Sequence, residues 1–348
     1  MSQVTAPELV DPAEAELLRK ALAGDADAFD RLTTPYRRRL HVHCYRMLGS
    51  PFDADDALQE TLLAAWRRLG TFEGRSAVGT WLISIATRVC LRMIAKRPPR
   101  LTSGDYREPL LATAELGEPV EGRVWLEPIP DSEFSNERAG GDDPVAAFLR
   151  REHIRLAFIA LLQHLPGTQR AVLLLREVLG YSAVETAGIL ETSIASINSA
   201  LQRARKTLRE KAHPGVPPAS MAEPTEQDAH RLLQAFVSAW ERSDVSTMVS
   251  LLADDARFTM PPLPAWFSGR EFVAKFFAER VFATPWLLQP IRGNGQPGFA
   301  CYQKQPGDDR FRPGGVGLLS CDGGRISAID SFLDPAVCRR FGMIEALP

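Results

Sequence analysis

Cysteine and histidine are scarce in this chain, which has five and six of them among 348 residues. No two cysteines form a C-x-x-C pair, so the sequence offers neither a zinc-binding pattern nor a disulfide framework. Apolar runs are short, such as Ala171–Leu175, which predicts no membrane-spanning segment. The first residues show no basic stretch followed by an apolar one, so we expect no secretory signal and a cytoplasmic location. No metal or cofactor site is predicted.

The net charge of −2 conceals an uneven distribution. Residues 11–100 carry 15 Lys and Arg against 11 Asp and Glu, and residues 145–213 carry 10 against 5. Residues 101–144, which lie between them, carry 3 against 11. Basic blocks suit a polyanionic partner, and an acidic segment between them can compete with that partner.

Periodicity and turn residues divide the chain into five segments. Residues 14–100 read as helices ended by Pro98-Pro99, and 145–212 read as helices again. Residues 101–144 and 213–224 have the Pro and Gly content of linkers. Residues 225–342 begin with amphipathic helices and continue with short strands and a hairpin signal at Asp322-Gly323-Gly324, which predicts an α+β domain. The expected strands are 256–260, 286–292, 298–303, 316–320 and 325–332.

The segment from Ser182 to Arg209 has the pattern of a helix-turn-helix. Ser182 and Glu185 form a capping-box pattern before a short helix whose apolar positions are Val184, Ala187, Ile189 and Leu190. After a break at 191–193, an apolar stripe marks a second helix through Ile194, Ile197, Leu201, Ala204 and Leu208. Its other face carries groups able to read base edges or hold phosphates: Ser196, Asn198, Ser199, Gln202, Arg203 and Arg205. The alternative is a helical hairpin with a solvated polar face.

Another helical segment, around residues 53–69, has an acidic outer face. Its inward stripe consists of Ala54, Leu58, Thr61, Leu62, Ala65 and Leu69. Asp55, Asp56, Gln59 and Glu60 stay outside, which the residues alone explain as a solvated face.

The residues of these segments resemble those of a known family. Residues 165–172 (LPGTQRAV), 181–187 (YSAVETA) and 197–205 (INSALQRAR) resemble region 4 of the extracytoplasmic-function sigma factors of the sigma-70 family. The resemblance implies that this domain reads the minus-thirty-five promoter element and meets the polymerase β flap. Glu191 departs from the family pattern, which usually has glycine at this turn.

The first helical block resembles region 2 of the same family. The resemblance implies docking on the clamp helices of the polymerase β′ subunit through Asp55, Asp56, Ala57, Leu58, Gln59 and Glu60. It also implies a promoter-melting segment, with a loop around Gly74 that holds a flipped minus-ten base. The minus-ten contacts implied are Phe72, Gly74, Arg75, Arg88, Arg92, Lys96 and Arg97. Phe72 and Trp81 can equally be core residues, and Arg88 stands where the family usually has asparagine.

The C-terminal segment resembles SnoaL-like domains, which are cone-shaped α+β barrels. The likeness rests on residues 293–300 (GNGQPGFA) and 329–335 (IDSFLDP). Sigma factors of the SigG/SigJ type join these same three parts, two all-α sigma domains followed by the barrel. Their linker and barrel motifs imply regulatory contacts here at Trp125, Leu126, Pro128, Asp322, Gly323, Gly324 and Arg325.

These observations favour a promoter-specific transcription initiation factor whose activity the barrel modulates. We expect no enzyme, because the candidate bases Asp254, Asp255 and Asp330 form no evident acid–base pair and His230 lies on the opening helix. Two alternatives stay open: a helix-turn-helix repressor or activator with a ligand-sensing barrel, and a cyclase or isomerase fused to a DNA-binding scaffold. The resemblance also admits an anti-sigma protein as partner and a small ligand in the barrel.

Overall fold

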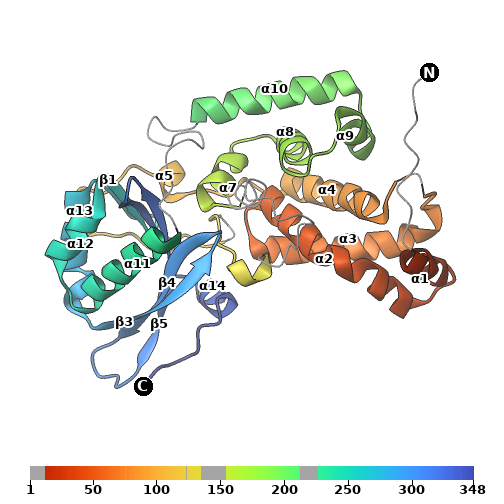
Figure 1. The fold of residues 1–348 in the computed structure, drawn as a ribbon. Coiled ribbons are helices and arrows are strands. Elements are labelled where there is room, and N and C mark those ends of the chain that lie inside the picture. Colours follow the sequence, from red (N-terminus) through yellow and green to blue (C-terminus); the bar gives the residue numbers. More distant parts are fainter. Residues whose placement is uncertain (1–11, 75, 123, 135–153, 212–225) are drawn as a thin grey trace. The chain divides into compact units, whose positions relative to one another are not determined.

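The computed structural model describes residues 12–74, 76–122, 124–134, 154–211 and 226–348 (Figure 1). Its chain divides into two compact units. Of the described residues, the first unit contains those from 12 to 99, residue 134 and residues 161–211. The second unit contains the described residues of 100–133, residues 154–160 and residues 226–348. The predicted linker 213–224, Arg75, and residues 135–153 of the predicted linker and second helical block lie outside the described residues.

Helices α1 (Pro12–Leu22), α2 (Ala26–Leu48), α3 (Pro51–Arg68) and α4 (Val78–Lys96) open the first unit. The corner between α2 and α3 follows directly from three adjacent residues. Gly49 takes a left-handed φ of 72°, and Ser50 accepts a hydrogen bond from the backbone N–H of Asp53. Pro51 then occupies the first helical turn, where its missing N–H costs nothing. This corner sets the direction of the acidic helix α3.

Helix α4 is the central helix of this unit. By length and composition alone it is apolar enough to cross a bilayer, which the short apolar runs of the sequence did not indicate. It carries Lys96 in its last turn, and it contacts α2, α3, α8 and α9. Leu82, Ala86 and Val89 have no exposed surface. The apolar character of α4 is therefore that of a core helix.

The helix-turn-helix is confirmed in α9 (Ala183–Leu190) and α10 (Ile194–Lys211), which follow α8 (Gly167–Leu173) and a π-helical turn at Leu174–Val178. The predicted capping box is present: the N–H of Ser182 donates to Glu185 over 2.7 Å, and the N–H of Glu185 donates to the Ser182 hydroxyl over 3.2 Å. Helix α9 ends at Glu191, whose φ is 52°.

Two apolar positions of this motif were placed wrongly by the sequence pattern. Val184 is 66% exposed and Ile194 is 45% exposed. Both lie in the first turn of their helices, where the chain has not yet reached the packed interface. Ala200, absent from the predicted stripe, is buried beside Ile197 and Leu201.

A six-stranded mixed sheet forms the second unit, in the order β2-β1-β6-β5-β4-β3. The strands are β1 (Leu252–Thr259), β2 (Trp266–Ser268), β3 (Trp286–Gly293), β4 (Gln296–Lys304), β5 (Phe311–Asp322) and β6 (Arg325–Phe332). All neighbours are antiparallel except β1 and β6, and the predicted hairpin joins β5 to β6. The three-residue strand β2 was not predicted because it is too short to show alternation.

Helices cover one side of this sheet (Figure 1). They are α11 (Glu226–Glu241), α12 (Val245–Leu251) and α13 (Arg270–Glu279). Helix α14 (Pro335–Arg340) follows the last strand and contacts β5, and the short α5 (Ser103–Tyr106) precedes the sheet in the chain. Aromatic rings fill the space between helices and sheet: Phe236, Trp240, Phe258, Phe267, Phe276, Phe277 and Phe299. Trp240 alone lies within 6 Å, centroid to centroid, of four other rings. The interior of the barrel is a packed core.

A buried histidine makes the stability of the first unit pH-dependent. His43 in α2 lies 2.9 Å from the Thr87 hydroxyl in α4, and burial lowers its pKa from 6.5 to about 3. The unfolded chain binds the proton more tightly, so this contribution to stability is full above pH 6.5 and is lost as the pH falls toward 3. We expect the free energy of unfolding to fall by about 2 kcal/mol from this group between pH 7 and pH 5.

Urea unfolding at both pH values, followed by circular dichroism, measures this. His43→Gln retains an amide for Thr87 and should remove that part of the pH dependence. His230→Gln, which alters an exposed histidine of α11, should leave it unchanged. An identical pH dependence for wild type and His43→Gln would refute the role of His43.

Candidate functional site

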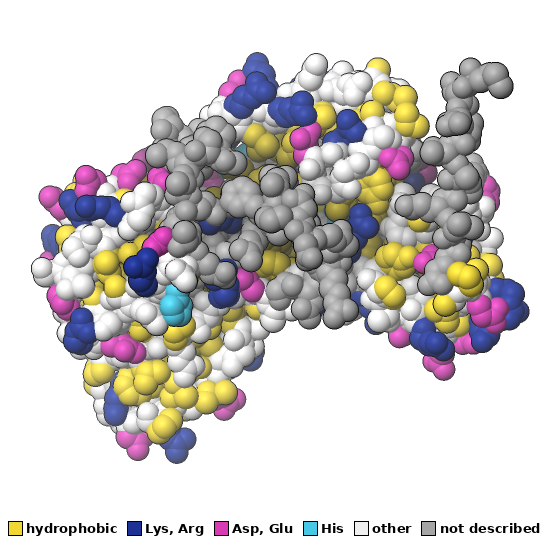
Figure 2. All heavy atoms as spheres, viewed as in Figure 1, with side chains coloured by type: hydrophobic (Ala, Val, Ile, Leu, Met, Phe, Trp, Pro, Cys, Tyr) yellow, Lys and Arg dark blue, Asp and Glu magenta, His cyan; other side chains and the backbone are white. Residues whose placement is uncertain are grey.

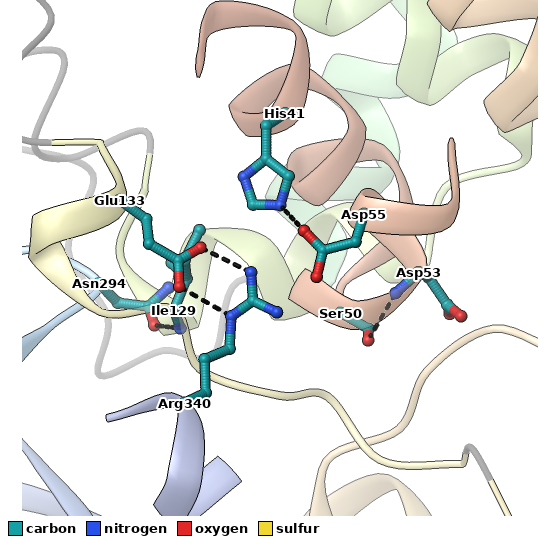
Figure 3. A network of polar contacts seen from close by, with 8 residues as sticks. All are labelled: His41, Ser50, Asp53, Asp55, Ile129, Glu133, Asn294 and Arg340. Atoms are coloured by element: carbon teal, nitrogen blue, oxygen red, sulfur yellow. Dashed lines mark hydrogen bonds and ion pairs between the residues drawn. The ribbon is translucent and has the colours of Figure 1, made fainter. Parts of the chain in front are cut away.

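Helix α3 has one acidic, exposed face and one buried face. Asp56, Gln59 and Glu60 are exposed. Asp55 is half-buried because its carboxylate lies 2.9 Å from Nε2 of His41 in α2 (Figure 3). Ala57 has no exposed surface, which corrects its prediction as a contact: it faces the helical core.

Ion pairs tie the basic end of α4 to α3. Arg97 pairs over 2.5 Å with Asp53, a buried carboxylate that the sequence pattern did not single out as a site residue. Arg92 pairs over 2.6 Å with Glu60. Lys96 is exposed. Two of the predicted phosphate contacts therefore already hold carboxylates of α3.

The loop between α3 and α4 presents one aromatic pair. The rings of Phe72 and Trp81 lie 5.0 Å apart between centroids, and both side chains are half-buried. Gly74 is exposed and has a φ of 66°, a conformation that favours glycine. Phe72 thus packs on Trp81 and still reaches the surface.

The six predicted base- and phosphate-reading side chains of α10 are all exposed. Lys and Arg side chains gather along this helix at the upper edge of the view in Figure 2. Ser193 caps the helix by accepting a hydrogen bond from the Ser196 N–H. Arg205 pairs over 2.5 Å with Glu177, which orients it along the helix surface. The face is arranged as a recognition helix requires.

Arg88, predicted as a minus-ten contact, points to the helix-turn-helix. Its guanidinium donates to the backbone oxygen of Ile189 over 3.2 Å and lies 3.0 Å from the Glu191 carboxylate. The two residues that depart from the family pattern therefore contact each other.

In the second unit, the segment after Arg100 is packed onto the barrel. Trp125, Leu126 and Pro128 are buried, and the buried Arg100 donates to the Trp125 oxygen over 2.8 Å. A small cavity of about 230 Å³ lies between this segment and the barrel residues Pro261, Pro262 and Phe332. The predicted motif is thus part of the barrel's packing.

Two side chains at the turn between β3 and β4 form hydrogen bonds to the segment that connects the helical blocks. Asn294 has no exposed surface, and its Oδ1 accepts from the Ile129 N–H over 2.9 Å (Figure 3). Its Nδ2 donates to the Ile154 oxygen over 2.7 Å. The Gln296 side chain accepts from the N–H of Leu156 over 3.1 Å. The sequence pattern identified this turn only as a mark of the fold, because buried amides carry no visible periodicity.

Ion pairs hold the same segment from outside. Asp131 pairs over 3.1 Å with Arg292 and accepts from the Gly295 N–H. Glu133 makes a two-pronged pair with Arg340 of α14, at 2.7 and 2.8 Å (Figure 3). Such bidentate geometry is the strong form of the arginine–carboxylate pair.

The hairpin at 322–325 projects into solvent. Asp322, Gly323, Gly324 and Arg325 are exposed, and Nη1 of Arg325 lies 3.3 Å from the Leu252 oxygen. That contact orients the arginine along the start of β1.

The candidate bases of the barrel are engaged in structural contacts. Asp254 pairs over 2.8 Å with Arg270. Asp330 accepts from the Thr259 hydroxyl over 2.9 Å, and burial raises the pKa of its carboxyl group. Among the described residues, no group of three or more His, Cys, Asp or Glu could hold a metal ion.

Comparison with known proteins gives the same three parts in the same order. Residues 32–98 match the family model of Sigma-70 region 2, and residues 155–208 match that of Sigma-70, region 4. Residues 233–287 match the SnoaL-like domain.

Relatives cover most of the chain. The RNA polymerase sigma factor SigG of Mycobacterium tuberculosis is 38% identical over 327 residues, which are 92% of this chain and 85% of that protein. The sigma-H factor of Pseudomonas aeruginosa is 29% identical over 59% of this chain and 97% of its own length. The crystal structure of M. tuberculosis SigJ shares the fold with a TM-score of 0.55 at 22% identity, covering 89% of this chain and 98% of that one. The chain therefore belongs to the extracytoplasmic-function sigma factors, which bind core RNA polymerase and direct promoter-specific transcription initiation.

Proposed function

We propose that α3 supplies the polymerase contact, that α4 and the loop before it read the minus-ten element, and that α10 reads the minus-thirty-five element. The exposed carboxylates and amide of α3 support the first assignment, and the exposed polar face of α10 supports the last. The corresponding domains are residues 14–100 and 145–212, and the place of action is the cytoplasm.

The polymerase assignment predicts loss of core binding when the exposed centre of α3 is removed. Asp56→Ala combined with Gln59→Ala should reduce co-purification with core polymerase at least tenfold, because both side chains lie at the middle of the exposed face. Asp27→Asn changes an exposed carboxylate of α2 in the same unit and should leave binding intact. Core binding by the double variant at the wild-type level would rule out α3 as the docking face.

The recognition assignment separates two kinds of side chain on α10. Once promoters are mapped by run-off transcription, Gln202→Ala should lower binding to the minus-thirty-five element by about 1–3 kcal/mol and relax its sequence preference, because an amide reads base edges. Arg203→Ala should weaken matched and mismatched duplexes alike and lower the salt dependence by about one counterion. Anisotropy titrations at several salt concentrations distinguish these results. A uniform loss for Gln202→Ala would contradict base reading.

In this proposal the barrel, residues 225–342, anchors the chain segment that connects the two DNA-reading domains. Of the described residues between α4 and α8, those from Arg100 to Glu133 and from Ile154 to Ala160 belong to the barrel's unit. The single side chain of Asn294 makes hydrogen bonds to backbone groups of both segments. A connector anchored at two points has less reach than a free chain of the same length, because anchoring removes most of its conformations. The barrel thereby limits the promoter spacings that the factor accepts.

This role predicts a change in spacing selectivity. Asn294→Asp keeps an acceptor for Ile129 but cannot donate to Ile154, so it should broaden the range of accepted spacers between the two promoter elements. Run-off transcription from templates with spacers altered by one and two base pairs measures this. Gln305→Asp, at an exposed turn of the same unit, is the matched control. An unchanged optimum and width for Asn294→Asp, with circular dichroism showing a folded barrel, would refute the holding role.

The proposal gives the barrel no catalytic activity. Aromatic side chains occupy its interior, and two of its candidate bases hold partners of their own.

A further inference from the structure

Glu191, which Arg88 contacts at the end of α9, is an unfavourable residue for that position. Glu191 ends α9 with a positive φ of 52°, a conformation that L residues other than Asn and Asp adopt at a cost. Its carboxylate also lies at the C-terminal end of a helix, where the unpaired backbone oxygens already carry negative partial charge. Both features are unfavourable for a glutamate.

Arg88 compensates for the charge at this helix end. One guanidinium nitrogen, Nη2, lies 3.2 Å from the Ile189 oxygen and 3.0 Å from the Glu191 carboxylate, so a single cation meets both negative groups. Its side chain is 32% exposed and that of Glu191 is 72% exposed. The pair is therefore reachable by solvent ions and by a competing polyanion.

The two helical blocks also pack closely at other points of the first unit. Gly167, at the start of α8, lies so near α4 that a Cβ there would come within 3.2 Å of Leu91 and 3.3 Å of Ile94. Arg170 of α8 donates to the Met47 oxygen at the end of α2. Within the first unit, the docked helix-turn-helix thus lies against the face of α4 that carries Arg88.

We propose that Glu191 competes with promoter phosphates for Arg88. In the free protein the Arg88–Glu191 pair, together with the Ile189 oxygen, fastens α9 to α4 and withholds Arg88 from DNA. When α9 moves away, Arg88 becomes available to a phosphate of the minus-ten strand, whose charge replaces that of Glu191. A carboxylate and a phosphate are both anions, so the exchange is one anion for another on the same guanidinium. This rests on the proposed minus-ten role of α4.

The proposal predicts opposite effects for the two partners. Glu191→Gln removes the competing charge and should tighten binding of single-stranded minus-ten DNA to the free full-length chain roughly 1.4- to 5-fold, the range for an exposed ion pair. Arg88→Gln should weaken the same binding and lower its salt dependence by about one counterion. The double variant should bind like Arg88→Gln alone. Glu210→Gln, on an exposed carboxylate of α10, should not tighten binding of this strand.

Fluorescence anisotropy with a labelled non-template oligonucleotide measures these affinities. Unchanged or weaker binding by Glu191→Gln, with wild-type binding readily detected, overturns the competition. A purely structural pair would make both substitutions act in the same direction.

A second measurement keeps the competition distinguishable from the minus-ten assignment. A photo-crosslinking amino acid at Thr192, beside the pair, should crosslink to peptides of α4 in the free chain, and Arg88→Gln should reduce that yield. If no variant binds the oligonucleotide but the crosslink depends on Arg88, the minus-ten role of α4 fails and the contact stands. If the crosslink is independent of Arg88 and Glu191, the fastening itself is refuted.

Discussion

The packing of the helical unit depends on one buried cation. Arg170 in α8 is almost fully buried, and burial lowers its pKa to about 10, which still leaves it charged at neutral pH. Its guanidinium donates to the backbone oxygens of Met47, Gln163 and Leu165 and to the Gln163 side chain. A charge taken out of water needs such compensation, and here oxygens from two domains supply it together. Separating the domains therefore means rehydrating Arg170 while the end of α2 loses its donor.

In the second unit, uncharged side chains provide hydrogen-bond partners for buried backbone groups. Backbone amides of an irregular segment must find partners when they are buried, and Asn294 and Gln296 provide them from one turn of the sheet. Asn294 thereby fixes two residues 25 positions apart in the chain, Ile129 and Ile154, and Gln296 adds a bond to Leu156.

The sequence allowed the architecture to be predicted because its signals are local. The capping box at Ser182 and the hairpin at Asp322 each lie within a few residues, and both are present. The stripe of α10 lies within one helix and is present except at the exposed Ile194. Ala57 was predicted as a polymerase contact but is buried. The family motif includes residues that pack behind the binding surface as well as residues that form it. The partners of Asp53, Arg88 and Asn294 are more than 40 residues distant, so no periodicity within a window can reveal them.

The close approach of Gly167 to α4 has a consequence for how the protein behaves in solution. Leu91 and Ile94 are only half-buried although α8 lies against them, so withdrawal of α8 would expose an apolar strip on α4. An opened molecule would then tend to self-associate unless polymerase or DNA covered the strip. Closure thus protects the solubility of the free factor, and substitutions that weaken it should be recognised first by aggregation during purification.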